Sequence, residues 1–123
     1  MELNRLEVYK ISREISKTAW NVYREMGNDV KFSIGQQFIR AVDSVGANIA
    51  EGYGRYHYLD SVKFYYNARG SLWESKHWVE LLYERHFISG ETYSQVSERL
   101  NTLGVKLNNF ISSVKNRATN NHK

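Results

Sequence analysis

Residues 93–114 read YSQVSERLNTLGVKLNNFISSV, and this segment decides the fold. Its apolar residues recur at alternating steps of three and four, which is the heptad period of a helix that packs nearly parallel or antiparallel to its neighbours. The seam consists of Tyr93, Val96, Leu100, Leu103, Leu107, Phe110 and Val114. The pattern therefore predicts a long helix whose apolar side is covered by other helices.

Three further helical patterns precede this segment. The first covers residues 5–26, the second begins after Ser33 and ends at Gly52-Tyr53-Gly54, and the third covers residues 60–85. Each carries apolar residues three and four positions apart, as a helix with one buried side requires. Because the three connections are short, helices that follow one another should be antiparallel. We predict an all-α fold, an antiparallel up-and-down four-helix bundle.

The expected helix ends follow from local sequence. Gly27-Asn28-Asp29 should end the first helix, because glycine and asparagine accept the left-handed conformation. Ser33 should cap the second helix with its hydroxyl, and Ser89-Gly90 should form the last turn. We assign residues 1–117 to one bundle domain and residues 118–123 to a disordered tail.

The composition narrows the class of protein. The chain has no proline, which favours long helices, and no cysteine, which excludes disulfides, thiolate zinc sites and a cysteine nucleophile. The first ten residues lack the apolar run of a signal peptide. No stretch approaches the roughly 18 apolar residues of a membrane span, so the expected location is the cytoplasm.

No motif points to catalysis. Glu74 and His77 have the Glu-x-x-His spacing of a metal-binding bundle helix, but no second copy completes such a site. Gly52-Tyr53-Gly54 follows a helix, whereas a phosphate-binding glycine loop follows a strand. Neither a Gly-x-Ser-x-Gly elbow nor a Walker lysine is present. We expect a protein that binds and is not an enzyme, with no cofactor and no metal.

The helix expected over residues 60–85 carries more large apolar side chains than one buried stripe needs. The additional set is Val62, Tyr66, Trp73 and Trp78. Since aromatic residues are enriched at interfaces, we predict that Tyr66, Trp73 and Trp78 meet another subunit. The alternative is that these rings cover the side of the core.

Basic residues suggest a polyanionic partner. After Glu98 the chain contains no acid, and Arg99 and Lys106 lie seven positions apart on one flank of the heptad seam. Arg55 lies in a turn with Tyr53 and Tyr56, where the rings could stack on bases and the guanidinium could hold a phosphate. Alternatively, the tyrosines close the end of the bundle and Arg55 bonds to helix-end carbonyls, while Arg99 and Lys106 pair with acids on a neighbouring helix.

One stretch resembles a known family. Arg40-Ala41, followed by the run from Ser44 to Arg55 with its Asn-Ile-Ala-Glu-Gly core, is similar to the signature of the bacterial 23S rRNA-intervening-sequence proteins, which are four-helix bundles. The likeness extends from Leu6 to Leu72. A proline common in the family is replaced here by Gly46, so a bend in the second helix is allowed and not enforced.

The resemblance implies a function and an assembly. Relatives that serve diversity-generating retroelements form ring-shaped homopentamers and bind nucleic acid and a reverse transcriptase. By this likeness the chain would be a homopentamer that binds RNA or DNA, with a reverse transcriptase or another protein as a further partner. The signature residues are read mainly as structural: Arg40, Asn48, Glu51 and Gly52, of which Gly52 should supply the left-handed conformation that ends the second helix. Our leading hypothesis is nucleic-acid binding through Arg55, Arg99, Lys106, Tyr53 and Tyr56, and the alternative is a protein scaffold that docks through the aromatic side of the 60–85 helix.

Overall fold

The computed structural model describes residues 2–55 and 57–121, and no strand occurs among them. A short 3₁₀ turn, η1 (Leu3–Arg5), precedes α1 (Glu7–Arg24). The remaining helices are α2 (Asn28–Lys31), α3 (Ile34–Tyr53), α4 (Tyr58–Glu84) and α5 (Gly90–Asn121). Among these described residues, no helix has the length and hydropathy of a membrane span.

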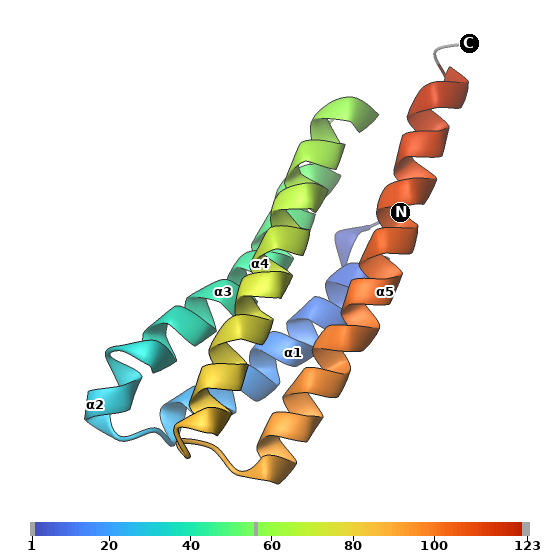
Figure 1. Cartoon of the computed structure of the whole chain (residues 1–123). Helices are drawn as coiled ribbons and strands as arrows, with labels where there is room; N and C mark the ends of the chain where they lie inside the picture. The colour runs from blue at the N-terminus through green and yellow to red at the C-terminus, as the bar shows by residue number, and fades with distance from the viewer. Residues whose placement is uncertain (1, 56, 122–123) are drawn as a thin grey trace.

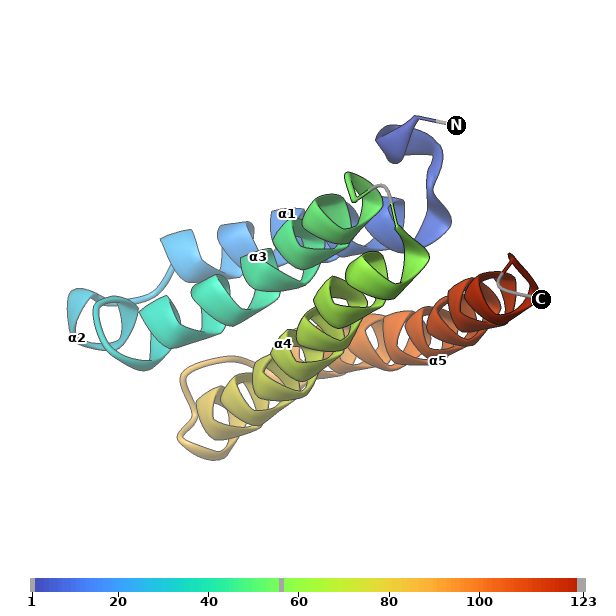
Figure 2. The ribbon, with the colours of Figure 1, turned by 90° about the horizontal axis from the view of Figure 1, so that it is seen from above.

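The four long helices form the predicted bundle (Figures 1 and 2). Each packs against two others: α3 lies beside α1 and α4, and α5 lies beside α4 and α1. Helices that follow one another run in opposite directions, so the up-and-down topology expected from the short connections is confirmed.

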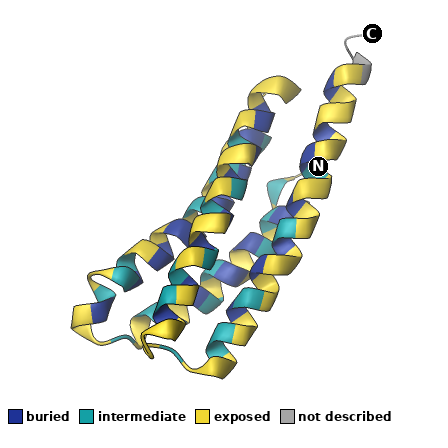
Figure 3. Ribbon diagram, in the orientation of Figure 1, coloured by how far each residue is buried: buried dark blue, intermediate teal, exposed yellow. Residues whose placement is uncertain are grey.

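The core lies along the bundle axis, where each long helix turns a buried stripe inward (Figure 3). On α5 the buried residues include Leu100, Leu103 and Leu107, all with no exposed surface. The heptad seam therefore points into the core, as predicted. Phe110 lies at the edge of this seam, where its ring meets that of Tyr65 edge-on at 4.8 Å, and Ile111 takes the central position.

Two predicted helix ends are wrong in detail. Gly27 has φ −64°, so the break after α1 is made by an extended residue and the extra turn α2, not by a left-handed glycine. The Ser33 hydroxyl donates to the carbonyls of Asp29 (2.7 Å) and Val30 (3.3 Å) and caps no N–H group of α3. A serine hydroxyl can bond backwards to carbonyls as well as forwards, and α2 places those carbonyls within its reach.

The turn before α5 contains the cap that the sequence analysis missed. The Thr92 N–H donates to the Ser89 hydroxyl over 3.1 Å, which satisfies one of the free donors in the first turn of α5. At the end of α4, His86 has φ 62°, the one positive φ among the described residues. Phe87 N–H donates to the Leu82 carbonyl and His86 N–H to the Tyr83 carbonyl, so His86 occupies the place usually taken by glycine.

The boundary predicted at residue 117 also needs correction. Helix α5 continues to Asn121, and residues 118–121 are helical where a disordered tail was expected. Ala118 follows Val114 by four positions and is 2% exposed, so it extends the buried stripe. Residues 122–123 lie outside the described residues.

Gly52 has a role other than the predicted one. It lies within α3 at negative φ and does not end the helix through a left-handed conformation. A Cβ atom at this position would lie 2.6 Å from Tyr65 Cε1 and 3.0 Å from the Ser61 carbonyl oxygen. The absence of a side chain therefore allows α3 to approach the first turns of α4. Gly46 serves the same purpose against α1, where an added Cβ atom would lie 3.0 Å from the Ser12 hydroxyl oxygen.

Candidate nucleic-acid interface

The residues predicted to contact phosphate do not share one surface. Arg55, just beyond α3, forms an ion pair with Glu51 and lies over the ring of Phe64 on α4, 4.6 Å from its centroid. Tyr53 is half-buried in the last turn of α3. Tyr56 lies outside the described residues. The charge of Arg55 is thus neutralised by a carboxylate one turn away.

Arg99 and Lys106 do lie on the same flank of α5, the side that faces α1. Lys106 forms an ion pair with Glu7, and the Arg99 guanidinium donates to the Thr18 hydroxyl. The Lys106 ammonium also lowers the pKa of the Glu7 carboxyl, chiefly by its hydrogen bond. Lys106 therefore pairs with an acid on a neighbouring helix, which is the alternative given for this cation. Arg99 also bonds to α1, but its partner there is a hydroxyl.

The signature residues hold helix contacts in place. Asn48 donates to the carbonyl (2.9 Å) and to the hydroxyl (3.0 Å) of Ser44, and the Ser71 hydroxyl of α4 donates to Ser44 over 2.9 Å. This chain of bonds joins α3 to α4. Arg40 is exposed on α3. Asn48, Glu51 and Gly52 thus make contacts within the chain.

The additional large apolar residues of α4 divide into two groups. Val62 is buried in the core, and Trp78 is half-buried against it, with its indole N–H 3.5 Å from Glu74. Tyr66 and Trp73 remain exposed, Trp73 to 63% of its surface. Of these four side chains, Tyr66 and Trp73 are open to a partner, while Val62 and Trp78 belong to the chain's own packing.

The two exposed rings belong to a cluster of basic and aromatic residues where α4 faces α5. We call it the α4/α5 face; its residues are Tyr66, Arg69, Trp73, Lys76, Asn108 and Lys115. The Arg69 guanidinium lies 4.7 Å from the centre of the Tyr66 ring, and the Lys76 ammonium lies 4.4 Å from the centre of the Trp73 ring. From α5, Lys115 donates to the Tyr66 phenol over 3.0 Å and Asn108 accepts from Arg69 over 3.3 Å.

The cations of this face are held without carboxylates. In the part of the chain that the structure describes, two ion pairs occur, Arg55–Glu51 and Lys106–Glu7, and neither involves Arg69, Lys76 or Lys115. Their partners are ring faces, a phenol and an amide, all neutral. Positive charge therefore remains on the α4/α5 face, and the Lys115 hydrogen bond lowers the pKa of the Tyr66 phenol.

The sequence contains a signal for this face that was overlooked. Tyr66-x-x-Arg69 and Trp73-x-x-Lys76 are the same unit, an aromatic residue followed three positions later by a cation, repeated after seven residues. Residues three apart are neighbours on a helix, so each cation can reach the ring before it. The seven-residue step places both units on one side of α4.

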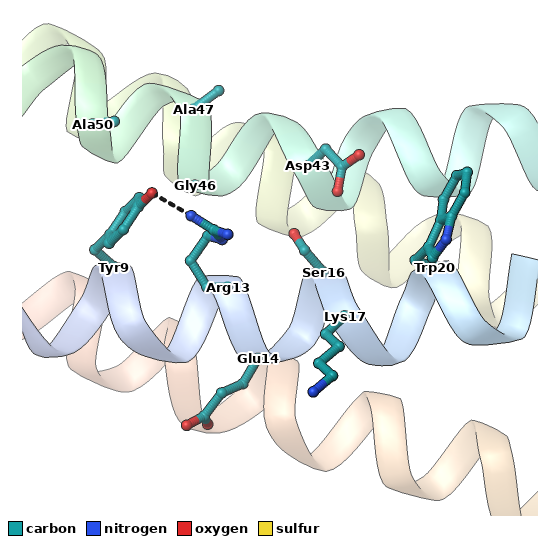
Figure 4. A pocket seen from close by; sticks show the side chains of 10 residues that line it. All are labelled: Tyr9, Arg13, Glu14, Ser16, Lys17, Trp20, Asp43, Gly46, Ala47 and Ala50. Carbon is teal, nitrogen blue, oxygen red and sulfur yellow. Dashed lines mark hydrogen bonds between the residues drawn. The ribbon is translucent and has the colours of Figure 1, made fainter. Parts of the chain in front are cut away.

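A second surface feature lies between α1 and α3 (Figure 4). We call it the α1/α3 groove, an open hollow of about 700 Å³. Tyr9, Arg13, Ser16 and Trp20 point from α1 towards α3, and the opposite wall is formed by Asp43, Gly46, Ala47 and Ala50. Arg13 donates to the Tyr9 phenol over 2.8 Å, and Trp20 is 49% exposed. The small residues leave this wall almost without side chains.

The Glu-x-x-His pair has other contacts. Glu74 accepts from the Trp78 indole, and the ring of His77 meets that of Trp78 edge-on at 4.8 Å. Across residues 2–55 and 57–121, no three histidine or acidic side chains come together as potential metal ligands.

Comparison with known proteins identifies the family resemblance independently. The family model described as "23S rRNA-intervening sequence protein" matches residues 4–109. A crystal structure at 1.70 Å, of a protein of unknown function from the S23 ribosomal protein family of Bacteroides thetaiotaomicron VPI-5482, is similar to this chain with a TM-score of 0.79 and 25% identity. The likeness covers 85% of this chain and 97% of the other. No curated protein matches the sequence.

Proposed function

Because the chain belongs to the 23S rRNA-intervening sequence protein family, whose signature it carries, we propose that it is a non-enzymatic, oligomeric nucleic-acid-binding protein whose phosphate contacts lie on the α4/α5 face. A basic surface was expected from the sequence, and the proposal places it on the α4/α5 face. Arg69, Lys76 and Lys115 replace Arg55 and Lys106, which pair with carboxylates, and Arg99, which bonds to Thr18 on the other flank of α5.

The observation that carries the proposal is the way these cations are held. An exposed cation that pairs with a carboxylate must give up that pair before it binds phosphate, and the free energy of the old contact offsets the new one. Arg69, Lys76 and Lys115 rest on neutral groups instead, with contacts to rings of about 0.5–1 kcal/mol each at exposed sites. They are positioned in advance and keep their charge for a polyanion.

The distribution of charge along α5 supports the same face. Beyond Glu98 its only charged residues are basic, and Lys115 lies in this acid-free part beside the N-terminal half of α4. A phosphate backbone that runs along the two helices would meet no carboxylate of α5 there. Binding to phosphates releases counterions, so affinity should fall steeply with salt.

The test compares two lysines of the same helix. Lys115→Gln and Lys106→Gln each remove one charge, but Lys115 has a neutral partner and Lys106 an acidic one. At low salt, the affinity for a single-stranded RNA should fall for Lys115→Gln and stay near wild type for Lys106→Gln. The slope of log affinity against log salt should also become shallower by about 0.7 for Lys115→Gln alone.

Two outcomes would contradict the proposal. Loss of binding with Lys106→Gln but not with Lys115→Gln would return the site to the flank between α1 and α5. Absence of binding to RNA and DNA at low salt would remove nucleic acid as a partner and favour the protein scaffold.

The α1/α3 groove favours self-association as a second activity of the same protein. Trp20 is half-exposed beside a wall of small residues, which lets another helix approach closely. A second copy that covers this groove would account for the exposed indole without occupying the α4/α5 face. Light scattering should show a homo-oligomer, a pentamer by the family resemblance, and Ala47→Arg should dissociate it while the helical circular dichroism is retained. A monomeric wild type would contradict this.

A further inference from the structure

We propose that the α4/α5 face takes single-stranded nucleic acid, with an unpaired base stacked on the indole of Trp73. This inference rests on the proposed function and specifies its ligand. Trp73 is 63% exposed, the most open of the large aromatic rings on α4. Lys76 lies over one face of the ring, so a base would stack on the opposite face, with the cation beside the adjoining phosphate.

Tyr66 and Trp73 differ in what they offer. Tyr66 is 36% exposed and is contacted by both Arg69 and Lys115, so its ring chiefly holds the two cations in place. Trp73 has one cation contact and a much larger open surface. The face therefore combines a cation anchor at Tyr66 with a stacking platform at Trp73.

The spacing of the two units suits a strand laid along α4. Seven residues of helix rise about 10.5 Å. In a stacked duplex one strand advances about 3.4 Å per nucleotide, and an unstacked single strand advances further, so about three nucleotides or fewer cover this distance. A strand with a base on Trp73 would thus bring a nearby phosphate to Arg69 and Lys115.

A duplex cannot use the same platform, because its bases are already stacked on one another and paired. It could meet the cations through its phosphates but would leave Trp73 uncovered. A single strand exposes base faces that stack on aromatic rings without regard to sequence. An open indole beside cations that form no ion pair in the described part of the chain favours the single strand.

The experiment measures fluorescence anisotropy of a labelled oligouridylate of about ten nucleotides, within the usual site sizes, and of a hairpin duplex, at low salt. Trp73→Ala should weaken binding to the single strand by roughly 10- to 100-fold, as loss of one stacked base does. It should leave duplex binding within about twofold, since phosphate contacts remain. Trp73→Phe keeps a ring and should restore most of the single-strand affinity.

Phe32→Ala is the matched control, because Phe32 is also exposed but lies at the end of α2, away from the α4/α5 face. Equal losses for Phe32→Ala and Trp73→Ala, or equal losses for single strand and duplex, would overturn the inference. So would dissociation of the oligomer by Trp73→Ala, which would place the indole in a subunit contact. If Trp73→Ala has no effect while Arg69→Gln and Lys115→Gln weaken binding, stacking fails and phosphate binding stands.

Discussion

The ammonium group of Lys115 on α5 donates a hydrogen bond to the phenol oxygen of Tyr66 on α4 over 3.0 Å. The bond lowers the pKa of that phenol, because a nearby cation favours the phenolate. Lys115→Met should raise the Tyr66 pKa back towards its ordinary value. The measurement is the NMR titration of the Tyr66 ring, assigned with Tyr66→Phe.

Lys106→Met provides the control for this titration. Its ammonium pairs with Glu7 on α1, on the other flank of α5, so its loss should leave Tyr66 unchanged. If Tyr66 titrates identically in the wild type and in Lys115→Met, the hydrogen bond does not persist in solution. Tyr66 then does not hold Lys115 in position before a ligand binds.

Gly52 and Gly70 should respond in opposite directions to the same substitution. At Gly52 an added Cβ would meet Tyr65 and the Ser61 backbone, and overpacking of this kind costs about 1–3 kcal/mol of unfolding free energy. At Gly70, within α4, nothing lies within 4 Å of an added Cβ. There alanine should stabilise the protein by about 0.5–1 kcal/mol through helix propensity.

Urea unfolding of Gly52→Ala and Gly70→Ala would measure both changes. A Gly52→Ala variant as stable as the wild type would show that α3 and α4 can separate slightly at no cost. That result would remove the packing explanation for this signature glycine.

Ser89 and Ser33 both precede a helix, but only one caps it. The Ser89 hydroxyl accepts from the Thr92 N–H, so Ser89→Ala should lower the unfolding free energy by about 1 kcal/mol. Ser33 donates to carbonyls of the preceding turn, so Ser33→Ala should cost clearly less. Chemical denaturation of both variants tests this, and equal losses would mean that the Ser33 hydroxyl turns to cap α3 in solution.

The bundle was predictable because its signal is local. The three- and four-residue steps from Val96 to Leu107 fix which side of α5 is buried, and the short connections fix the topology. The ends were harder to predict. A serine before a helix has two uses for its hydroxyl, and the sequence does not show that α2 would bring the carbonyls of Asp29 and Val30 to Ser33.

The candidate site was only partly predictable, because charge compensation depends on contacts between distant residues. Lys106 looks free in the sequence, and its partner Glu7 lies on another helix. The exposed positions of Tyr66 and Trp73 followed from the stripe of α4, but Trp78 shares that helix and packs against the core. The repeated aromatic-x-x-cation unit is the sequence pattern that predicts the contacts of Arg69 and Lys76 with the rings.

The phenol of Tyr65 has a raised pKa, whereas that of its sequence neighbour Tyr66 is lowered. Its side chain is buried, and burial raises the pKa of its phenol to about 12, against the smaller, lowering influence of its bond with Ser61. In the unfolded chain the same phenol ionises near its ordinary pKa of about 10. Between about pH 10 and pH 12 the unfolded state therefore loses this proton first, and the stability of the folded state falls.

Tyr65→Phe removes this contribution, because phenylalanine cannot ionise. Relative to its own value at neutral pH, the unfolding free energy of the variant should decline less than that of the wild type over the same range, by as much as about 2 kcal/mol. Urea denaturation at a series of alkaline pH values measures the difference. The contributions of the other tyrosines are the same in both proteins and cancel. Parallel decline of the two proteins would mean that water reaches the Tyr65 hydroxyl, and that the close approach of α3 and α4 at Gly52 opens readily in solution.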